Sequence, residues 1–296
     1  MTEILPLSRS QITPAVLAAL AEDAPYGDLT SQLLIPEAAR VVAVLNAREP
    51  GIFSGTAVFD AAMELTDPAI SVQWQLADGE EFASGAELAV VEGPARSVLT
   101  AERVGLNLVQ RMSGIATLTA QYVTAVTAVP GNRSRVVDTR KTTPGLRALE
   151  RFAVRCGGGH NHRYSLSDAV MAKDNHLAVL SQGDHRKLTA VLSTLRPRLS
   201  HTTHIEVEVD SIAQIEPVLA AGVDTIMLDN FSLEELREGV RLVAGRALVE
   251  ASGNVRLETI AQIAATGVDI ISVGALTHSV RALDLGLDVR FGSESR

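Results

Sequence analysis

Cysteine and aromatic residues are scarce in this sequence. One cysteine, Cys156, stands among 296 residues, so an internal disulfide is excluded and the composition fits the reducing cytosol. Aromatic residues make up 3% and hydrophobic residues 46%, so we expect a core of Ala, Val, Ile and Leu, which is usual where helices pack on a parallel sheet. We interpret Cys156 as a small buried apolar residue rather than a catalytic thiol.

Long apolar segments are lacking as well. The first 14 residues contain no sustained apolar run, so we expect no signal peptide. A charge-free segment, 112–132, is long enough to cross a bilayer, but its Ser, Thr and Gln residues and Pro130 favour a buried helix of a soluble protein. The sequence also lacks a basic tail, a zinc-spaced Cys/His set and a basic patch interleaved with aromatics. We therefore expect a cytoplasmic protein that binds neither membranes nor nucleic acid.

What is present is one basic region in an acidic chain. Lys and Arg total 26 against 35 Asp and Glu, a formal net charge of −9. Residues 133–173 nevertheless hold nine basic residues and three acidic ones. This imbalance indicates a site for a small polyanionic ligand. Arg147, Arg151 and Arg155 recur at helical spacing, so for these three a solvated helix face is an equally good interpretation.

The N-terminal part of the chain predicts a mixed α+β module, with antiparallel strands. We expect a short helix over 13–22, with Thr13 as N-cap and Pro14 at the first helical position. Short strands are expected at 40–45, 71–74 and 88–91, and a helix at about 56–66. A long helix follows at about 97–110.

From Asn132 onward, apolar runs alternate with helix-length segments. Six runs have the length and composition of buried strands: 135–138, 169–173, 205–209, 225–228, 247–250 and 270–273. Such alternation is typical of βα units with a parallel sheet. The predicted fold class is therefore α/β, with a six-stranded TIM-like barrel.

The segment 137–176 carries two of these strands and a helix between them. The first strand ends in Asp138-Thr139-Arg140-Lys141 and the second in Lys173-Asp174-Asn175. Pro144 follows Thr142 and Thr143, which are candidate N-caps, so we expect the helix to start there and to end at Gly157. Barrels keep their catalytic groups at the carboxyl ends of strands, so the cations at both strand ends are candidate functional residues.

Two further strands end in carboxylates. Glu208 and Asp229 occupy consecutive strand ends, and Glu206 points the same way as Glu208 along its strand. Carboxylates on a rim that also carries Lys and Arg suit Mg²⁺ held between protein and phosphate groups, because this hard ion prefers oxygen ligands. The alternative is a salt-bridge layer that closes the barrel mouth.

The last two predicted strands end in glycine-containing turns. Ser252-Gly253-Asn254 follows one strand and Gly274-Ala275 the other. Glycine lets backbone N–H groups approach a ligand closely, and the loops after the final strands form the usual phosphate site of a barrel. Together the two turns predict a phosphate site.

The cations of the rim divide by their chemistry. Three arginines suit planar, bidentate recognition of carboxylates: Arg103, Arg140 and Arg163. Each charge-assisted hydrogen bond contributes about 1.5–3 kcal/mol. Lys141 and Lys173 act better as point charges on phosphate. His162 is either a further donor or a structural residue.

The motifs that contain these residues resemble one family. The segments DTRKTTPGLR, GGGHNHR and SDAVMAKDNH, followed by EVEVD, IMLDNF, EASGN and SVGALTHS, closely resemble quinolinate phosphoribosyltransferase, also called nicotinate-nucleotide pyrophosphorylase (carboxylating). The match extends upstream through YGDLTS, GIFSG and LTAERVGLNLVQRMSGIAT and covers nearly the whole chain. The resemblance implies an open six-stranded α/β barrel over 111–275 and an N-terminal α/β sandwich domain over 1–110, to which the tail 276–296 returns.

The resemblance also implies a reaction. The ring nitrogen of quinolinate attacks C1 of phosphoribosyl pyrophosphate (PRPP), pyrophosphate leaves with Mg²⁺, and the 2-carboxylate is lost as CO₂. The product is nicotinate mononucleotide, on the de novo route to NAD. The family works as a homodimer or hexamer, with Arg103 reaching into a neighbouring subunit.

The positions that match the family's motifs receive their roles from the resemblance. Quinolinate would contact Arg103, Thr139, Arg140, Lys141, His162 and Arg163. PRPP and its phosphates would contact Lys173, Ser252, Gly253, Asn254, Val273, Gly274 and Ala275. The implied catalytic residues are Lys141, Lys173, Glu208 and Asp229, and the two carboxylates would hold Mg²⁺ directly or through water.

Two departures from the family's pattern bear on the shape of the pocket. Ala172 stands where a bulky aliphatic residue is usual, and Ser165 stands in place of the usual glycine. Three other functions stay open: a barrel aldolase that forms a Schiff base on Lys173, a molybdenum-transport-associated paralogue with another substrate, and a non-catalytic ligand-binding protein.

Overall fold

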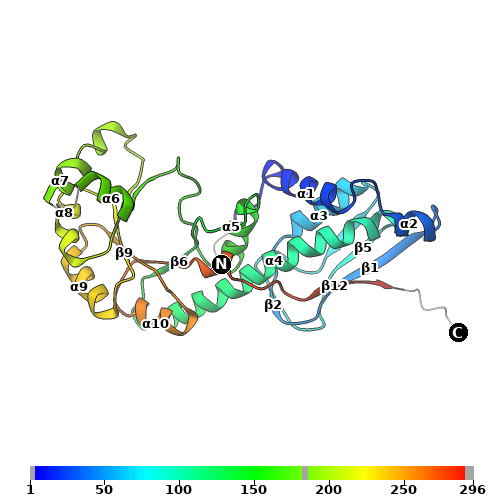
Figure 1. Ribbon diagram of the computed structural model, residues 1–296. Helices are drawn as coiled ribbons and strands as arrows, with labels where there is room; N and C mark the ends of the chain where they lie inside the picture. Colours follow the sequence, from blue (N-terminus) through cyan, green and yellow to red (C-terminus); the bar gives the residue numbers. More distant parts are fainter. Residues whose placement is uncertain (1–3, 182–185, 291–296) are drawn as a thin grey trace. The chain divides into compact units, whose positions relative to one another are not determined.

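A computed structural model describes residues 4–181 and 186–290, and the chain divides into two compact units (Figure 1). The antiparallel unit comprises Met1–Ala120, Thr142–Gly158 and Thr277–Arg296, and the barrel unit comprises Gln121–Lys141 and Gly159–Leu276. The domain boundaries implied by the resemblance, at 110/111 and 275/276, stay a prediction.

The antiparallel unit is built on a four-stranded sheet with the strand order β12-β1-β5-β3. Its strands are β1 (Arg40–Ala47), β3 (Ser71–Trp74), β5 (Glu87–Pro94) and β12 (Leu285–Arg290). The short strands β2 (Gly51–Ile52) and β4 (Glu81–Phe82) pair separately. β12 pairs with β1 in the register Leu45↔Leu287, so the C-terminal part of the chain completes this sheet. The three predicted strands are confirmed.

The helices α1 (Arg9–Asp23), α2 (Leu29–Leu34), α3 (Thr56–Thr66) and α5 (Arg147–Cys156) also belong to this unit. The long helix α4 (Ala95–Thr127) carries the chain from this unit into the barrel unit. Within the described part of the chain, no helix combines the length and the apolarity needed to cross a membrane.

The scarce aromatic residues gather in the core of the antiparallel unit. Phe53 and Phe59 are fully buried, and their ring centroids lie 5.1 and 5.6 Å from that of Trp74. The indole N–H of Trp74 donates to Asp60 Oδ1 at 2.8 Å, so the polar atom of the largest side chain is satisfied. Leu45, Leu88 and other buried aliphatic residues complete this core.

The barrel unit contains six parallel strands in the order β6-β11-β10-β9-β8-β7. They are β6 (Arg135–Val137), β7 (Val170–Ala172), β8 (Ile205–Val209), β9 (Thr225–Asp229), β10 (Leu248–Ser252) and β11 (Ile270–Ser272). β6 and β7 are the two edges of the sheet, which makes the barrel open. The predicted six-stranded α/β barrel is confirmed, and β8 coincides with the predicted strand from its first residue to its last.

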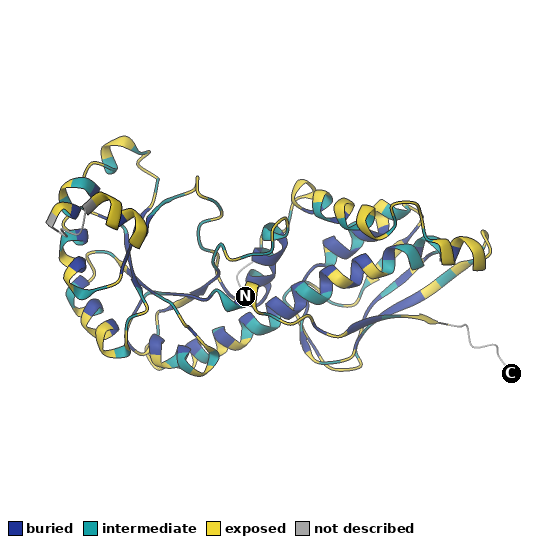
Figure 2. Cartoon of the chain, viewed as in Figure 1, coloured by how far each residue is buried: buried dark blue, intermediate teal, exposed yellow. Residues whose placement is uncertain are grey.

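Helices cover the barrel strands on the outside (Figures 1 and 2). They are α6 (Asp174–Ser181), α7 (Arg186–Leu192), α8 (Ile215–Leu219), α9 (Leu233–Val243), α10 (Leu257–Ala264) and α11 (Ala275–His278), with 3₁₀ turns η1 (Arg196–Arg198) and η2 (Ile212–Gln214). In α9, Leu236, Gly239 and Val243 are buried, while the opposite side is exposed (Figure 2). This spacing of three and four residues is the pattern of a helix that packs one face on a sheet.

Three predicted helix boundaries are wrong, each for a local reason. α1 begins at Arg9 rather than near Thr13, because the Gln11 side chain accepts the backbone N–H of Ser8 and caps an earlier turn. The segment 97–110 and the first part of the segment 112–132 form the single helix α4, which ends at Thr127, so residues 128–132 lie outside it. α5 begins at Arg147 rather than after Thr143, because the Thr143 N–H donates to the Glu150 side chain and the intervening residues form a turn.

Candidate functional site

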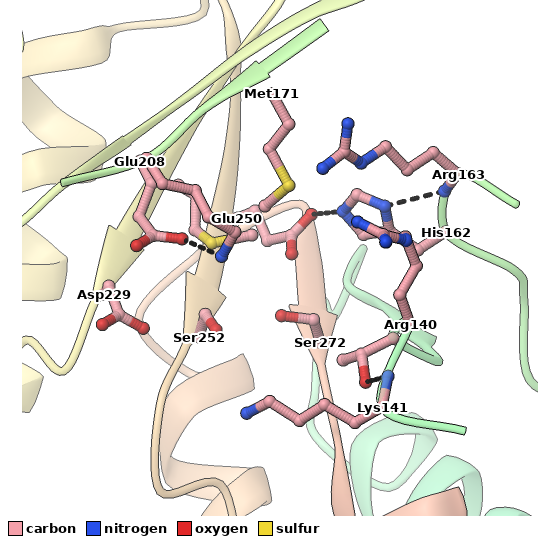
Figure 3. Close-up of a pocket in the computed structure, with 13 residues that line it drawn as sticks. Arg140, Lys141, His162, Arg163, Met171, Glu208, Asp229, Glu250, Ser252 and Ser272 are labelled. Atoms are coloured by element: carbon pink, nitrogen blue, oxygen red, sulfur yellow. Dashed lines mark hydrogen bonds and ion pairs between the residues drawn. The ribbon is translucent and has the colours of Figure 1, made fainter. Parts of the chain in front are cut away.

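A cavity of about 420 Å³ opens at the carboxyl ends of the barrel strands (Figure 3). Nine residues predicted from the sequence line it: Thr139, Arg140, Lys141, His162, Arg163, Lys173, Glu208, Asp229 and Ser252. Four residues that were not predicted line it too: Met171, Met227, Glu250 and Ser272. We call this cavity the barrel pocket. The parallel strands bring these residues together, because they all place their carboxyl ends at one mouth.

The remaining predicted residues lie elsewhere. Arg103 is an exposed residue of α4 in the antiparallel unit. Gly253 and Asn254 line a smaller cavity beside Asn230. Three more are not among the residues that line the barrel pocket: Val273, which is buried, Gly274, and Ala275, the first residue of α11.

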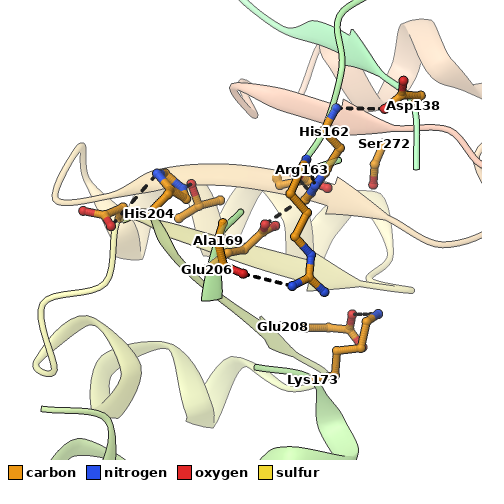
Figure 4. A network of polar contacts seen from close by, with 12 residues as sticks. Asp138, His162, Arg163, Ala169, Lys173, His204, Glu206, Glu208 and Ser272 are labelled. Carbon is orange, nitrogen blue, oxygen red and sulfur yellow. Dashed lines mark hydrogen bonds and ion pairs between the residues drawn. The ribbon is translucent and has the colours of Figure 1, made fainter. Parts of the chain in front are cut away.

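The rim of the barrel pocket carries an ion pair between the ends of two adjacent strands. Lys173 follows β7, and its Nζ lies 2.8 Å from Glu208 Oε2 on β8 (Figure 4). Asp229, at the end of β9, accepts a hydrogen bond from Asn230 Nδ2 at 2.6 Å. Ammonium and carboxylate groups therefore meet at the rim, as the sequence predicted.

Asp138 organises the loop that carries the cations. This fully buried carboxylate accepts the backbone N–H of His162 at 2.8 Å and the side-chain amide of Asn161 at 2.5 Å (Figure 4). Arg163 Nη1 in turn donates to the carbonyl oxygen of Ala169 at 3.0 Å. Asp138 thus fixes His162 and Arg163 at the barrel pocket, a positioning role that the sequence reading had not assigned to it.

Two guanidinium groups face the barrel pocket close to each other. Burial and the neighbouring charge of Arg140 lower the pKa of Arg163, against the opposing effect of Glu206 and Asp168. An anion bound at the pocket would reduce the repulsion between the two guanidinium groups. The arginine pair therefore suits an anionic ligand.

Ser165, one of the two departures from the family pattern, lies in the loop after Arg163. Its backbone N–H and its hydroxyl both donate to the Asp168 side chain, each at 3.1 Å. Ser165 thus stabilises the turn of the loop. Ala172, the other departure, is buried at the end of β7.

A buried cluster of His162, Glu206 and Glu250 lies against the barrel pocket. The imidazole Nε2 lies 3.2 Å from Glu206 Oε2 and 3.5 Å from Glu250 Oε2. The glutamates are 4% and 1% exposed, and among the described residues no hydrogen-bond partner exists for the second oxygen, Oε1, of either one. Sequence reasoning missed Glu250, although the alternation that aligned Glu206 with Glu208 also directs Glu250 to the same side of its strand as Ser252.

The protonation of this cluster follows from its hydrogen bonds. Burial lowers the pKa of His162, and the hydrogen bonds and charges of the two carboxylates raise it by more. A doubly protonated ring would need a proton on Nδ1, yet Nδ1 accepts the backbone N–H of Arg163 at 2.7 Å (Figure 3). The ring therefore carries one proton, on Nε2, and the high proton affinity belongs to the cluster as a whole.

Among the residues that the structure describes, two groups at the barrel pocket have the composition of a metal site. His162, Glu206 and Glu250 offer atoms within 4.8 Å of one another. A metal-binding histidine nitrogen must be unprotonated, but here Nε2 is the protonated nitrogen, so this cluster does not fit a metal. Glu208 and Asp229 offer hard carboxylate oxygens at the pocket rim, which fits Mg²⁺.

The loops after β9 and β10 contain residues with an unusual backbone conformation. Asn230 and Asn254 have φ of 59° and 50°, a left-handed conformation rare for residues with a side chain. Asn254 Nδ2 donates to Asn230 Oδ1 at 3.0 Å. A Cβ on Gly253 would lie 2.2 Å from that same oxygen, so only glycine fits between the two asparagines. Strain of this kind concentrates at ligand sites.

Comparisons with known proteins agree with this geometry. Residues 28–113 match the family model of the quinolinate phosphoribosyl transferase N-terminal domain, and residues 115–288 match that of its C-terminal domain. The nicotinate-nucleotide pyrophosphorylase [carboxylating] of Mycobacterium leprae is 43% identical over 92% of this chain and 94% of that protein. A probable enzyme of the same name from Bacillus subtilis is 40% identical over 93% and 92%.

Solved structures give the same result. The crystal structure of NadC from Streptococcus pyogenes superposes with a TM-score of 0.89 at 40% identity, covering 97% of this chain and all of that one. The nicotinate-nucleotide pyrophosphorylase of Francisella tularensis gives 0.88 at 36% identity, with 98% and 100% coverage. The chain belongs to the quinolinate phosphoribosyltransferase family.

Proposed function

We propose that this protein converts quinolinate and PRPP to nicotinate mononucleotide, pyrophosphate and CO₂, a step of NAD biosynthesis. One observation carries the proposal: four cations, Arg140, Lys141, Arg163 and Lys173, line the same pocket as the carboxylates Glu208 and Asp229. Such a pocket is complementary to a pyridine dicarboxylate beside a sugar that bears phosphate groups. The similarity to pyrophosphorylases of this name supports the assignment.

The cations hold the pyridine dicarboxylate in place. Arg140 and Arg163 offer planar pairs of N–H donors that match a carboxylate, and Asp138 and Ala169 fix the loop that carries Arg163. Lys141 adds a compact positive charge at the same pocket. Fixing the ring in this way aligns its nitrogen with the ribose carbon that it attacks.

The rim residues serve the transfer of the ribosyl group. Positive charge develops on the sugar and negative charge on the departing pyrophosphate, so Lys173 and the rim carboxylates lie where each charge is stabilised. Glu208 and Asp229 would hold Mg²⁺, which supplies charge neutralisation for the pyrophosphate when bound. Ser252, Gly253 and Asn254 follow β10 and suit the 5′-phosphate, with backbone N–H groups as donors.

The decisive assay combines the purified protein with quinolinate, PRPP and MgCl₂, and measures nicotinate mononucleotide and CO₂. We expect equal amounts of the two products, and neither of them when PRPP is omitted. Folded protein that forms neither product would overturn the assignment.

The barrel aldolase hypothesis requires a neutral Lys173 amine. The ion pair of Lys173 with Glu208 at 2.8 Å engages that amine as a charged donor instead. Borohydride treatment in the presence of carbonyl substrates should therefore leave Lys173 unmodified, as peptide mass spectrometry would show.

We further propose that a second copy of the chain completes the pocket with Arg103. This arginine is exposed on α4 and is not among the residues that line the barrel pocket of its own chain. Mixed assemblies of Arg103→Ala and Arg140→Ala subunits test the idea: each variant alone should have little activity, and mixing should restore part of it. Mixtures as inactive as their components would contradict shared sites.

A cytosolic location, inferred from the single buried thiol, completes the proposal.

A further inference from the structure

The proposed reaction needs a proton that none of the roles above supplies. When CO₂ leaves, the bond between C2 and the carboxylate carbon breaks, and its electron pair stays on C2. The positive ring nitrogen stabilises this pair, but the product is complete only when C2 gains a proton. The inference below rests on the proposed function and asks which group of this chain provides that proton.

We propose that Glu250, held as an uncharged carboxylic acid by His162 and Glu206, donates this proton to C2. The Glu250 O–H bond breaks and the C2–H bond forms as the bond from C2 to the carboxylate carbon breaks, so the proton transfer assists CO₂ loss, and Glu250 is left as a carboxylate. Water entering the pocket at product release returns the proton, so atoms and charges balance over one turnover.

The hydrogen bonds around His162 leave a proton for Glu250. Nδ1 accepts the Arg163 N–H at 2.7 Å, so the imidazole has one N–H, on Nε2. Two carboxylate oxygens share that single donor, at 3.2 and 3.5 Å. Two ionised carboxylates this close, both at least 95% buried, would repel each other in a medium that screens charge poorly, unless one of them is protonated.

Glu250 is the member of the pair that holds the proton and can deliver it. Its burial and the charge of Glu206 raise its pKa, despite the opposing effect of His162. Glu250 lines the barrel pocket whereas Glu206 is not among its lining residues. Glu250 Oε1 is buried and has no hydrogen-bond partner within the described residues, so the protein engages only one of the two oxygens of this carboxyl group.

Ligand binding favours the same protonation state. Quinolinate brings two carboxylates into a pocket that Glu250 lines, and an ionised glutamate there would oppose the attraction of Arg140 and Arg163. A neutral acid removes the repulsion and supplies a donor. As CO₂ leaves, the ligand loses one negative charge, so ionisation of Glu250 costs less at the step at which its proton is used.

The test is Glu250→Gln in a single turnover, with pyrophosphate and CO₂ measured in the same sample. Glutamine is uncharged and nearly the same shape as the acid, but it cannot donate this proton. We expect pyrophosphate release within about threefold of the natural protein, and CO₂ release about 10²–10⁴-fold slower, the usual contribution of a general acid. The undecarboxylated mononucleotide should accumulate and be visible by mass spectrometry.

Two further variants keep the test decisive. Glu238→Gln makes the same exchange at an exposed glutamate of α9, outside the barrel pocket, and its ratio of pyrophosphate to CO₂ should stay at one. Glu250→Asp retains an acid and should bring the ratio closer to one than Glu250→Gln does, which also serves if the glutamine variant fails to fold. Equal slowing of both products in Glu250→Gln, or no slowing, would overturn the proposal. A natural protein that makes neither product would instead refute the proposed function.

Discussion

Each of the two units buries a glutamate almost completely, and the two glutamates have opposite surroundings. Glu150 in the antiparallel unit and Glu250 in the barrel unit are both 1% exposed. Glu150 Oε1 accepts Nε and Nη2 of Arg111 at 2.7 and 2.5 Å, and Oε2 accepts the Thr143 N–H at 3.1 Å. Glu250 shares one imidazole N–H with a second carboxylate.

The contrast shows that burial alone does not define a functional acid. Glu150 has a cation and a backbone donor as partners, and through them the residue fastens α5 to α4. Glu250 has no cation as a hydrogen-bond partner among the described residues, and its environment stabilises the uncharged form. The first arrangement serves stability, and the second leaves a proton at a ligand pocket.

The largest expected effect is on stability, and it should separate the two glutamates. Glu150→Gln leaves the Arg111 guanidinium without its anion, which we expect to cost about 2–4 kcal/mol, somewhat below the usual figure because Arg111 is partly exposed. Glu250→Gln replaces one uncharged group with another and should change stability by less than about 1 kcal/mol. Urea unfolding of both variants at pH 7 measures the difference. Equal losses of unfolding free energy would contradict the proposed difference between the two glutamates.

Substitution of an arginine in each unit should have different effects on the affinity for quinolinate. Arg140→Ala removes a donor pair from the barrel pocket, so quinolinate should bind about 10–100-fold more weakly, as expected for about 1.5–3 kcal/mol, while PRPP binding changes less. Arg111→Ala, in the antiparallel unit, should reduce stability and leave quinolinate affinity within about threefold. Calorimetric titration of each ligand checks both variants. Equal losses for quinolinate and PRPP in Arg140→Ala would contradict its role.

A smaller expected effect is the pH dependence of the free energy of unfolding. The hydrogen bonds from Arg281 and from the Asp284 N–H lower the pKa of Glu49, in the antiparallel unit, from 4.5 to about 2. Its contribution to stability is therefore present above pH 4.5 and lost as the pH falls toward 2. The pKa of Glu250 is raised, so its contribution is present below pH 4.5 and declines as the pH rises through the folded-state value.

Unfolding free energies measured over a pH series distinguish these cases. Glu49→Gln should flatten the acid side of the stability curve, and Glu250→Gln should flatten the decline above pH 4.5. The groups that set the Glu250 response are Glu206 on β8, His162 with its neighbour Arg163, and Ser272 on β11. A Glu250→Gln curve parallel to that of the natural protein would mean that Glu250 is already ionised.

The strands and their polar ends were predictable because the signal is local. In β9, the apolar residues 226–228 mark a buried strand and Asp229 marks its carboxyl end. In β8, Glu206 and Glu208 alternate with apolar residues, which directs both glutamates to one side of the strand. These local patterns placed Glu208 and Asp229 at one pocket. Helix starts were less predictable, since Thr13-Pro14 and Ser8 with Gln11 are competing caps of similar quality. The hydrogen bond from the Ser8 backbone N–H to the Gln11 side chain favours the earlier start of α1.

The buried cluster was not predictable, because its partners come from distant parts of the chain. Glu250 lies inside an apolar run, and nothing beside it in the sequence indicates that His162 and Glu206 lie within hydrogen-bond reach. The protonation of the cluster depends on one backbone contact, from Arg163 N–H to Nδ1. Only the folded chain shows that contact.

Infrared difference spectroscopy at pH 7 tests the contrast between the two buried glutamates most directly. Subtracting the spectrum of Glu250→Gln from that of the natural protein should reveal the C=O stretch of a protonated carboxylic acid. The same subtraction with Glu150→Gln should reveal only carboxylate bands. Carboxylate bands in both difference spectra would show that Glu250 holds no proton and would contradict the account.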